Sequence, residues 1–126
     1  MPFVAVVDDE ETVRKALKRL LRAAGLDAEG YASGQEFLDG TSDRRPDCVV
    51  LDLHMPSMSG LQLLQRIRQM TKRLPVVIIT AHDEPETREQ CLAAGASSYL
   101  CKPLDDRLLL NAISAALGKS GAHVRR

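Results

Sequence analysis

The sequence predicts an α/β domain with a doubly wound, five-stranded parallel sheet and five helices. Apolar runs alternate with amphipathic stretches five times along the 126 residues, which is the order typical of a parallel sheet covered by helices on both faces. The runs at 48–51 (CVVL) and 76–79 (VVII) are apolar without interruption, as expected of strands buried on both faces. The length suits a single domain with its own hydrophobic core.

Local signals place the individual elements. The expected strands are 3–7, 27–31, 48–51, 76–79 and 98–101. The expected helices are 11–24, one from Ser33 to Gly40, one opening at Ser59, one opening at Asp83-Glu84-Pro85, and 104–117. Ser33 and Ser59 each precede a Glu or Gln by three positions, which is the capping-box pattern of a helix start. Gly25, Gly40 and Gly118 are expected to end helices because glycine readily adopts the left-handed conformation that follows a last turn.

The apolar faces of the helices differ in strength. The first helix has five apolar positions at helical spacing, namely Val13, Leu17, Leu20, Leu21 and Ala24. The third is expected to turn Leu63, Leu64, Ile67 and Met70 inward. The fourth offers only Cys91, Leu92, Ala93 and Ala94, after the polar Thr87 and Arg88. We therefore expect the fourth helix to be weakly anchored and easy to shift.

Composition excludes several classes of function. The 17 basic and 17 acidic side chains sum to zero, so no basic face indicates direct nucleic-acid contact. No apolar run approaches the roughly 20 residues of a membrane span, and Met1-Pro2-Phe3 leads into a strand without a signal peptide. The three cysteines form no CxxC motif, which favours a reduced, cytoplasmic location over a disulfide or zinc framework. Cys101 is expected to be a small buried strand residue.

Polar residues follow four of the predicted strands. Asp8-Asp9, Asp52, Thr80 and Lys102 each come just after an apolar run. Parallel strands bring their carboxyl ends to one edge of the sheet, where ligands of open α/β sheets bind. Three carboxylates and one lysine at this edge sum to a charge of −2, which one Mg²⁺ neutralises, and hard oxygen ligands suit that ion. The cluster predicts a site for a divalent cation and a phosphoryl group.

The chemistry of such a cluster is phosphoryl transfer. An aspartate can attack phosphorus and form an acyl phosphate, a step that needs mainly positioning and neutralised oxygen charge. Lys102 would neutralise charge and Thr80 would offer a hydroxyl. Each residue alone also has an ordinary interpretation: Asp8 and Asp9 as helix caps, Asp52 as a turn former, Thr80 as a strand-end residue, and Lys102 as a solvated side chain. Four complementary groups at four strand ends are difficult to explain as independent turns.

These motifs resemble the receiver domain of bacterial two-component response regulators. The similarity rests on VVDDE, VVLDLHMPSMSG, IITA and AGASSYLCKP and covers residues 3–118, with phrasing most similar to the FixJ-like group. It implies a flavodoxin-like fold with strand order 2-1-3-4-5, which is a known doubly wound order for receiver proteins. We expect residues 1–120 to form the receiver domain and 121–126 to be a tail or the start of a linker.

The resemblance also implies a role for each residue of the cluster. Asp52 matches the phosphorylated aspartate, and Mg²⁺ would be held by Asp8, Asp9, Asp52 and the backbone carbonyl of His54. Thr80 matches the switch hydroxyl, Lys102 the lysine that pairs with the phosphoryl oxygens, and Tyr99 the aromatic ring that turns inward when Thr80 moves. The Lys102–Pro103 peptide bond is expected to be cis. His54 and His82 are expected to be exposed, at positions that vary in the family and tune dephosphorylation.

The implied function is a phosphorylation switch rather than an enzyme with its own substrate. A sensor histidine kinase would phosphorylate Asp52, and the domain would contribute self-phosphorylation and self-dephosphorylation. The face formed by helix four, strand five and helix five would control an output. The expected output is transcription, because FixJ-like receivers precede a LuxR-type DNA-binding domain. That output domain is missing from this chain, and the same face would allow a homodimer on phosphorylation.

Three other classes remain as alternatives. A flavin- or nucleotide-binding domain would carry a phosphate-cradling loop after strand one, where this chain has Asp-Asp-Glu-Glu at 8–11. A phosphatase-type hydrolase would show a DxDx[TV] pattern there, which Asp8–Thr12 does not match. A pseudo-receiver that only binds partners would have lost part of the acidic cluster, which is intact here.

Overall fold

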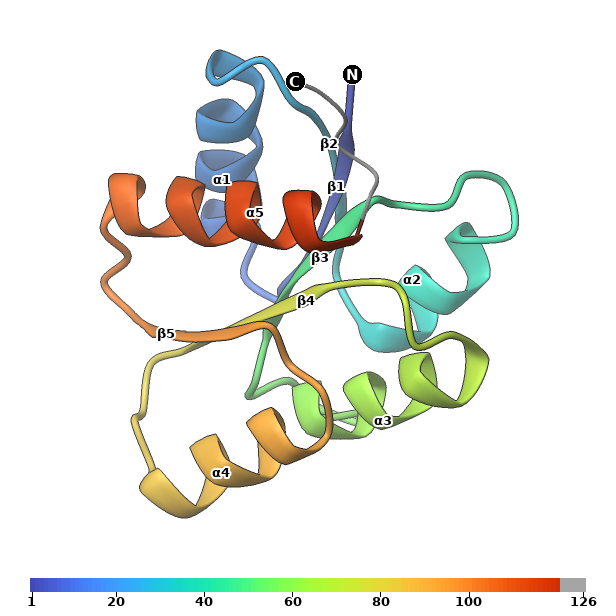
Figure 1. Cartoon of the computed structure of the whole chain (residues 1–126), viewed down its shortest axis with the longest axis vertical. Helices are drawn as coiled ribbons and strands as arrows, with labels where there is room; N and C mark the ends of the chain where they lie inside the picture. Colours follow the sequence, from blue (N-terminus) through green and yellow to red (C-terminus); the bar gives the residue numbers. More distant parts are fainter. Residues whose placement is uncertain (121–126) are drawn as a thin grey trace.

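The fold is a five-stranded parallel sheet flanked by helices, as the computed structural model describes it for residues 1–120 (Figure 1). The tail expected at 121–126 lies outside the described residues. The strands are β1 (Phe3–Val7), β2 (Asp27–Tyr31), β3 (Cys48–Asp52), β4 (Val76–Thr80) and β5 (Ser98–Cys101). The helices are α1 (Glu11–Ala23), α2 (Gly34–Gly40), α3 (Gly60–Met70), α4 (Pro85–Ala93) and α5 (Asp106–Ser120). The spatial order of the strands is β2-β1-β3-β4-β5, which confirms the predicted doubly wound order.

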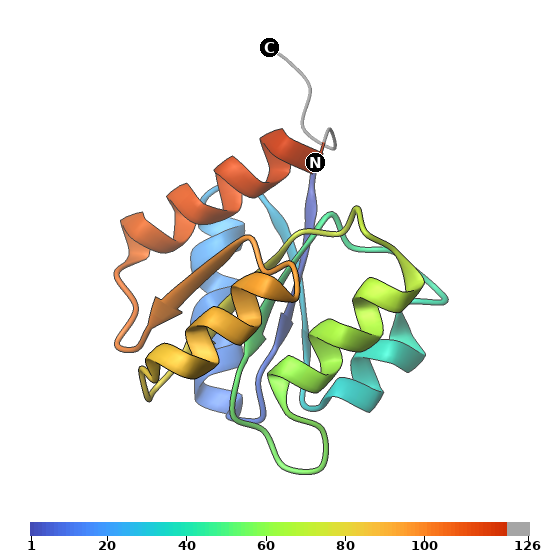
Figure 2. The ribbon, with the colours of Figure 1, turned by 60° about the horizontal axis from the view of Figure 1, so that its bottom comes forward.

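Two apolar layers enclose the sheet. Helices α1 and α5 cover one face, and α2, α3 and α4 cover the other (Figure 2). All residues of β1, β3 and β4 are buried, because these central strands have a helical layer on each side. Successive residues of each strand point to opposite faces of the sheet. Val50 therefore belongs to the α1/α5 core, while Val49 and Leu51 belong to the α2/α3/α4 core.

The helix starts predicted at Ser33 and Ser59 are confirmed by their caps. The Ser33 hydroxyl accepts a hydrogen bond from the backbone N–H of Glu36 at 3.1 Å. Ser59 and Gln62 form a reciprocal capping box, in which each side chain accepts from the other's backbone N–H. Helix α4 has Pro85 in its first turn, where a missing N–H costs no helical hydrogen bond. These local interactions begin each helix directly after a loop at the carboxyl edge of the sheet.

Four expectations about single residues are wrong. Met70 is 62% exposed because it is the last residue of α3, beyond the turn where Ile67 meets the sheet. Ala24 is exposed at the C-cap of α1, where the chain already turns into Gly25. Gly118 lies inside α5 and does not end it, since it does not take the positive φ that Gly25 and Gly95 take. Cys101 is exposed because it is the last residue of β5, which is an edge strand of the sheet.

The Lys102–Pro103 peptide bond is cis, as the family resemblance implies. His54 and His82 are both exposed, again as expected. Among residues 1–120, no helix has the length and apolar character needed to cross a membrane.

Candidate functional site

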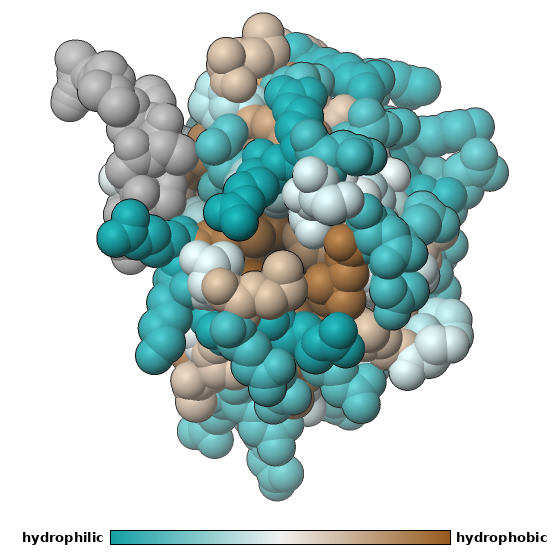
Figure 3. Space-filling view, turned by 90° about the vertical axis from the view of Figure 1, so that its right-hand side faces the viewer, coloured by the Kyte–Doolittle hydropathy of each residue, from teal (hydrophilic) through white to brown (hydrophobic). Residues whose placement is uncertain are grey.

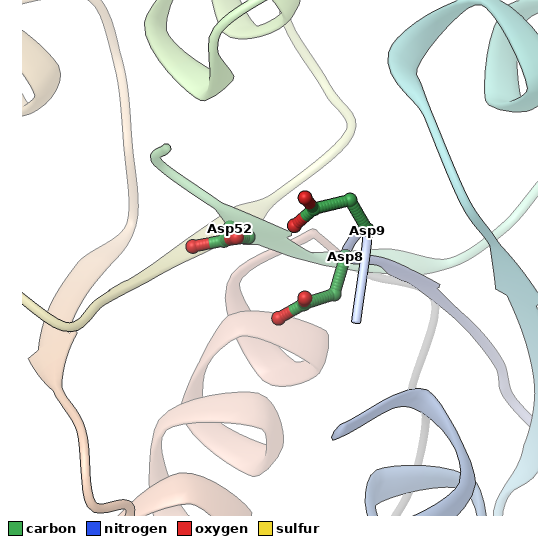
Figure 4. Close-up of side chains that lie close together, drawn as sticks. All are labelled: Asp8, Asp9 and Asp52. Atoms are coloured by element: carbon green, nitrogen blue, oxygen red, sulfur yellow. The ribbon is translucent and has the colours of Figure 1, made fainter. Parts of the chain in front are cut away.

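The predicted polar residues do meet at one edge of the sheet. Strands β1 and β3 pair in parallel with Val7 opposite Leu51, so the residues that follow, Asp8 and Asp52, emerge side by side. Figure 4 shows Asp8, Asp9 and Asp52 gathered at the ends of these two strands. One oxygen from each carboxylate lies within 4.8 Å of the others. Residues more than 40 positions apart in the chain thus lie together. We call the cluster of Asp8, Asp9 and Asp52 the acidic pocket.

The acidic pocket has the donor chemistry of a magnesium site. Asp8 and Asp52 are buried while Asp9 is exposed, so the cluster is held rigidly on one side and open to solvent on the other. Mg²⁺ prefers a few carboxylate oxygens and retains several waters, which requires an open position of this kind. The three carboxylates can therefore hold a divalent cation. The predicted role of the His54 carbonyl as a ligand stays a prediction.

Asp52 is the most strongly perturbed carboxylate of the pocket. Burial raises its pKa to about 6, and the neighbouring charge of Asp8 acts in the same direction, against the opposing effects of Lys102 and the His54 backbone N–H. That N–H lies 3.4 Å from the Asp52 Oδ1 atom. A carboxylate that is costly to ionise among other carboxylates gains most from a nearby cation, so the electrostatics and the geometry indicate the same kind of site.

Lys102 connects the acidic pocket to the neighbouring edge of the sheet. Its Nζ atom lies 3.2 Å from Asp8 Oδ2, 3.4 Å from Glu10 Oε1 and 3.8 Å from Asp52 Oδ1. Burial acts to lower the pKa of Lys102, but the charges of Asp52 and Asp8 outweigh it and the net shift is upward. The ammonium group is thus firmly protonated and lies where a group bound to Asp52 would meet it.

Glu10 is the member of the site that sequence reasoning missed. It was read as part of the loop after strand one, yet its carboxylate binds Lys102 and its backbone N–H donates to Asp8 Oδ1 at 2.9 Å. The adjacency Asp8-Asp9-Glu10 was the available signal. Helix α1 has no side-chain cap at Glu10, so the ordinary interpretation of Asp8 and Asp9 as caps of this helix is not what the structure shows.

The Thr80 side chain is buried beside the pocket and engaged with its own loop. Its hydroxyl donates to the carbonyl of His82 at 3.0 Å and accepts from the backbone N–H of His82 at 3.1 Å. Both bonds hold the hydroxyl toward residues 81–82 of the loop between β4 and α4. Reaching a group on Asp52 would require Thr80 to give up these bonds.

Tyr99 lies outside the acidic pocket. Strand pairing places it beside Ile78, two residues before Thr80, and its ring packs against the α2/α3/α4 core. The structure therefore brings together Asp8, Asp9, Asp52, Thr80 and Lys102. Tyr99 lies apart from them, in the α2/α3/α4 core beside Ile78.

Gly60 allows α3 to start directly against the acceptor strand. A Cβ atom at this position would collide with the Asp52 carbonyl oxygen and would lie 2.7 Å from the Leu53 Cα. The Gly60 N–H instead donates to the Leu53 carbonyl at 2.8 Å. Only glycine permits this backbone approach, which fixes the loop that follows Asp52.

A hollow lies at the opposite edge of the sheet and does not include the site. It measures about 740 Å³, and Figure 3 shows apolar side chains at its floor within a hydrophilic rim. Its lining includes Phe37, Ile67 and Leu74 with Arg45 and Arg73, from segments that precede β3 and β4. The chemistry of the molecule is instead concentrated in the open acidic pocket.

Comparisons with known proteins agree with this geometry. Residues 4–114 match the model of the response regulator receiver domain. The chain is 33% identical over 123 residues to the transcriptional regulatory protein FixJ of Azorhizobium caulinodans, covering 98% of this chain and 58% of that protein. It is 41% identical over 100 residues to the DNA-binding transcriptional regulator NtrC of Klebsiella pneumoniae, covering 79% of this chain and 21% of that protein. The crystal structure of a receiver domain protein from Clostridium thermocellum superposes with a TM-score of 0.91 at 30% identity, covering 97% of this chain and 98% of that one.

The chain belongs to the response regulator receiver domains, the phosphorylation switches of two-component systems. It spans a fifth to three fifths of the length of the two curated relatives named above. Both are transcriptional regulators, which fits the predicted control of an output.

Proposed function

We propose that Asp52 accepts a phosphoryl group from the phosphohistidine of a sensor histidine kinase, in a reaction that needs Mg²⁺ held by Asp8, Asp9 and Asp52. The observation that supports this most directly is the meeting of three carboxylate oxygens within 4.8 Å, with the Lys102 ammonium 3.8 Å from Asp52. In the transfer, an Asp52 carboxylate oxygen forms a bond to phosphorus while the bond from phosphorus to the histidine nitrogen breaks. The electron pair of that bond stays on the imidazole, which is left neutral if its other nitrogen carried a proton and otherwise becomes neutral by taking one proton from water.

The residues around Asp52 would balance the negative charge of the bound phosphoryl group. When bound, Mg²⁺ neutralises negative charge on the phosphoryl oxygens and on the carboxylates that face them. Lys102 is already held beside Asp52 and Asp8 and offers a second positive charge to the product. Thr80 offers a hydroxyl once it leaves the His82 backbone. A phosphoryl group adds about two negative charges, and Lys102, Thr80 and the cation balance them.

The output surface proposed for this domain is the face made of α4, β5 and α5. These elements lie next to the β4–α4 loop in the fold, so a movement of Thr80 reaches them through adjacent chain. We infer that phosphorylation changes this face and thereby controls homodimerisation or a DNA-binding output domain of the kind found in the transcriptional relatives.

Mass spectrometry of the protein treated with acetyl phosphate tests the proposal. We expect the wild type to gain one phosphoryl group in the presence of Mg²⁺ and none after chelation with EDTA. Asp52→Asn should gain none, whereas Asp43→Asn, which removes an exposed carboxylate at the opposite edge of the sheet, should behave like the wild type. Equal labelling of Asp52→Asn and the wild type would exclude Asp52 as the acceptor. Absence of labelling in all proteins would support a pseudo-receiver that binds partners without phosphorylation.

A further inference from the structure

Arg88 joins the loop that holds Thr80 to the aromatic ring of Tyr99. It lies in the second turn of α4, and its guanidinium binds the Asp83 carboxylate with 3.0 Å between Nη2 and Oδ2. The same guanidinium lies over the Tyr99 ring, with 5.2 Å from its Cζ atom to the ring centroid. A cation over an aromatic face at this range is attracted by the ring. One side chain thus contacts both the loop and the strand that the proposed switch must move.

The Tyr99 ring is half-buried, with Arg88 over one face. Its hydroxyl is shielded from solvent without a hydrogen-bond partner among the described residues. Burial raises the pKa of Tyr99, and the backbone N–H of Glu84 acts against this shift, which locates the hydroxyl near the start of α4. The contact with Arg88 and the packing against the core of α2, α3 and α4 together hold the ring in this position.

The loop between β4 and α4 is held in the same arrangement by three separate contacts. The Thr80 hydroxyl exchanges two hydrogen bonds with the His82 backbone. The His82 ring lies 5.7 Å from the His54 ring, edge to face. Asp83 is bound by Arg88. If Thr80 turns to a phosphoryl group on Asp52, residues 82 and 83 must move, and the Asp83–Arg88 contact belongs to the arrangement that is left behind.

We infer that Arg88 is a positioning residue that stabilises the unphosphorylated arrangement by fastening Asp83 to the Tyr99 ring. This inference rests on the proposed role of Asp52 and adds the side chain that opposes activation. Removing a contact made in only one of two conformations shifts the population toward the other. Arg88 variants should therefore favour the activated arrangement before any phosphoryl group is present.

The test is the affinity for beryllofluoride, a phosphoryl mimic, in the presence of Mg²⁺. Because the chain contains no tryptophan, isothermal titration calorimetry is the suitable measurement. We expect Arg88→Ala to bind beryllofluoride about three- to tenfold more tightly than the wild type, the range given by one exposed ion pair and one exposed cation–π contact. Arg88→Lys retains a cation near Asp83 and should return most of the affinity toward the wild-type value.

Two further variants separate this role from a merely structural one. Asp83→Asn should tighten binding in the same direction, and the double variant Asp83→Asn/Arg88→Ala should be no tighter than the tighter single variant, because both changes break one contact. Lys15→Ala removes another exposed ion pair, to Glu11 on α1, and should leave the affinity unchanged. A residue that only stabilised the fold would weaken beryllofluoride binding or leave it unaltered when removed.

The outcomes distinguish the proposed role of Arg88 from the proposed phosphorylation of Asp52. If the wild type binds beryllofluoride, Asp52→Asn does not, and Arg88→Ala binds with equal or lower affinity, the inference about Arg88 is wrong and the proposed function stands. If the wild type does not bind at all, both are overturned.

Discussion

Helices α1 and α4 both cover parallel strands, but they are attached to the sheet in different ways. Helix α1 buries Leu17 and Leu21 almost completely and adds Val13 and Leu20 to the same core. Within Pro85–Ala93 of α4, Cys91 is the buried residue, while Leu92 remains 47% exposed. Helix α1 is therefore part of the rigid scaffold, whereas α4 is held to the sheet by few apolar contacts.

The location of this difference has a functional consequence. Helix α4 follows directly on the loop that binds Thr80, and it packs near the edge strand β5 that carries Tyr99. An element that must shift when the domain is phosphorylated belongs to the less stable part of the fold. Rigid attachment on the α1 side lets the acidic pocket keep its geometry while the α4 side changes.

The largest expected effect is the loss of a buried leucine on α1. Leu21 is fully buried, and Leu21→Ala should lower the free energy of unfolding by about 2–5 kcal/mol, the range for a leucine truncated in a packed core. Urea denaturation followed by circular dichroism measures it. A loss below roughly 1 kcal/mol would mean that α1 is no better anchored than an exposed helix, and the contrast with α4 would disappear.

The ionisation of Asp52 should have the next largest effect. Its folded pKa is about 6 against 3.8 for an unperturbed aspartate, so in the folded state the charged form is disfavoured and stability declines as the pH rises from about 4 through 6. Asp52→Asn cannot ionise. It should therefore be more stable than the metal-free wild type by about 1–3 kcal/mol at pH 8, and this advantage should disappear near pH 4.

A carboxylate on the α1 side provides the control with the opposite sign. Asp27 accepts a hydrogen bond from Arg44, which lowers its pKa despite some desolvation. Its contribution to stability is present at neutral pH and is lost as the pH falls through that lowered pKa. Asp27→Asn should thus never stabilise the protein at pH 8.

Mg²⁺ tests whether the carboxylates of the acidic pocket share a cation. If Mg²⁺ does not reduce the stability advantage of Asp52→Asn over the wild type at pH 8, the carboxylates do not share a cation.

Cysteine labelling measures the local stability of the two regions directly. Cys101 is exposed, whereas Cys48 and Cys91 are both buried. Burial raises the pKa of Cys48 to about 12 and also raises the pKa of Cys91. Under native conditions we expect N-ethylmaleimide to modify Cys101 first, then Cys91 through local opening of α4, and Cys48 last. The rate at Cys91 should exceed that at Cys48 by more than about tenfold if α4 opens by itself.

Equal labelling rates at Cys91 and Cys48 would contradict local opening, because both thiols would then be released only by unfolding of the whole domain. Cys91→Ala and Cys48→Ala, each with Cys101→Ser, assign the rates to single thiols by mass spectrometry. Cys101→Ser is the matched background, since its removal changes an exposed side chain.

The central strands and the acidic pocket could be predicted because both follow from chain-local patterns. Uninterrupted apolar runs such as VVII identify strands covered on two faces, and parallel pairing then brings Asp8 and Asp52 together without knowledge of any side-chain conformation. Periodicity also identified the face of α1 that carries Leu17 and Leu21. In each case the determining interactions lie within one element or in the pairing of neighbouring strands.

The exposure of single side chains and the contacts of long ones could not be predicted, because they depend on how the elements pack against one another. Helical spacing assigns Met70 to an inward face, but whether anything covers that face at the last turn of α3 is a tertiary property. Cys101 continues an apolar strand, yet it is exposed at the end of the edge strand β5. Lys102 pairs with Glu10, which is far away in the chain, and Arg88 contacts Tyr99 in a different element. Long side chains of this kind can choose among several partners.

The smallest expected effect repeats the first substitution on the other helix. Leu92 is half exposed on α4, and Leu92→Ala should change the free energy of unfolding by no more than about 0.5–1 kcal/mol, measured by the same urea denaturation as Leu21→Ala. The chemical change is identical at both positions, so the ratio of the two losses reports attachment to the core and not side-chain size. A loss at Leu92 comparable to that at Leu21 would show that α4 is anchored through its exposed side, and the division into scaffold and switch regions would have to be abandoned. A small loss combined with weakened self-association of the phosphorylated protein would instead assign Leu92 to the output surface.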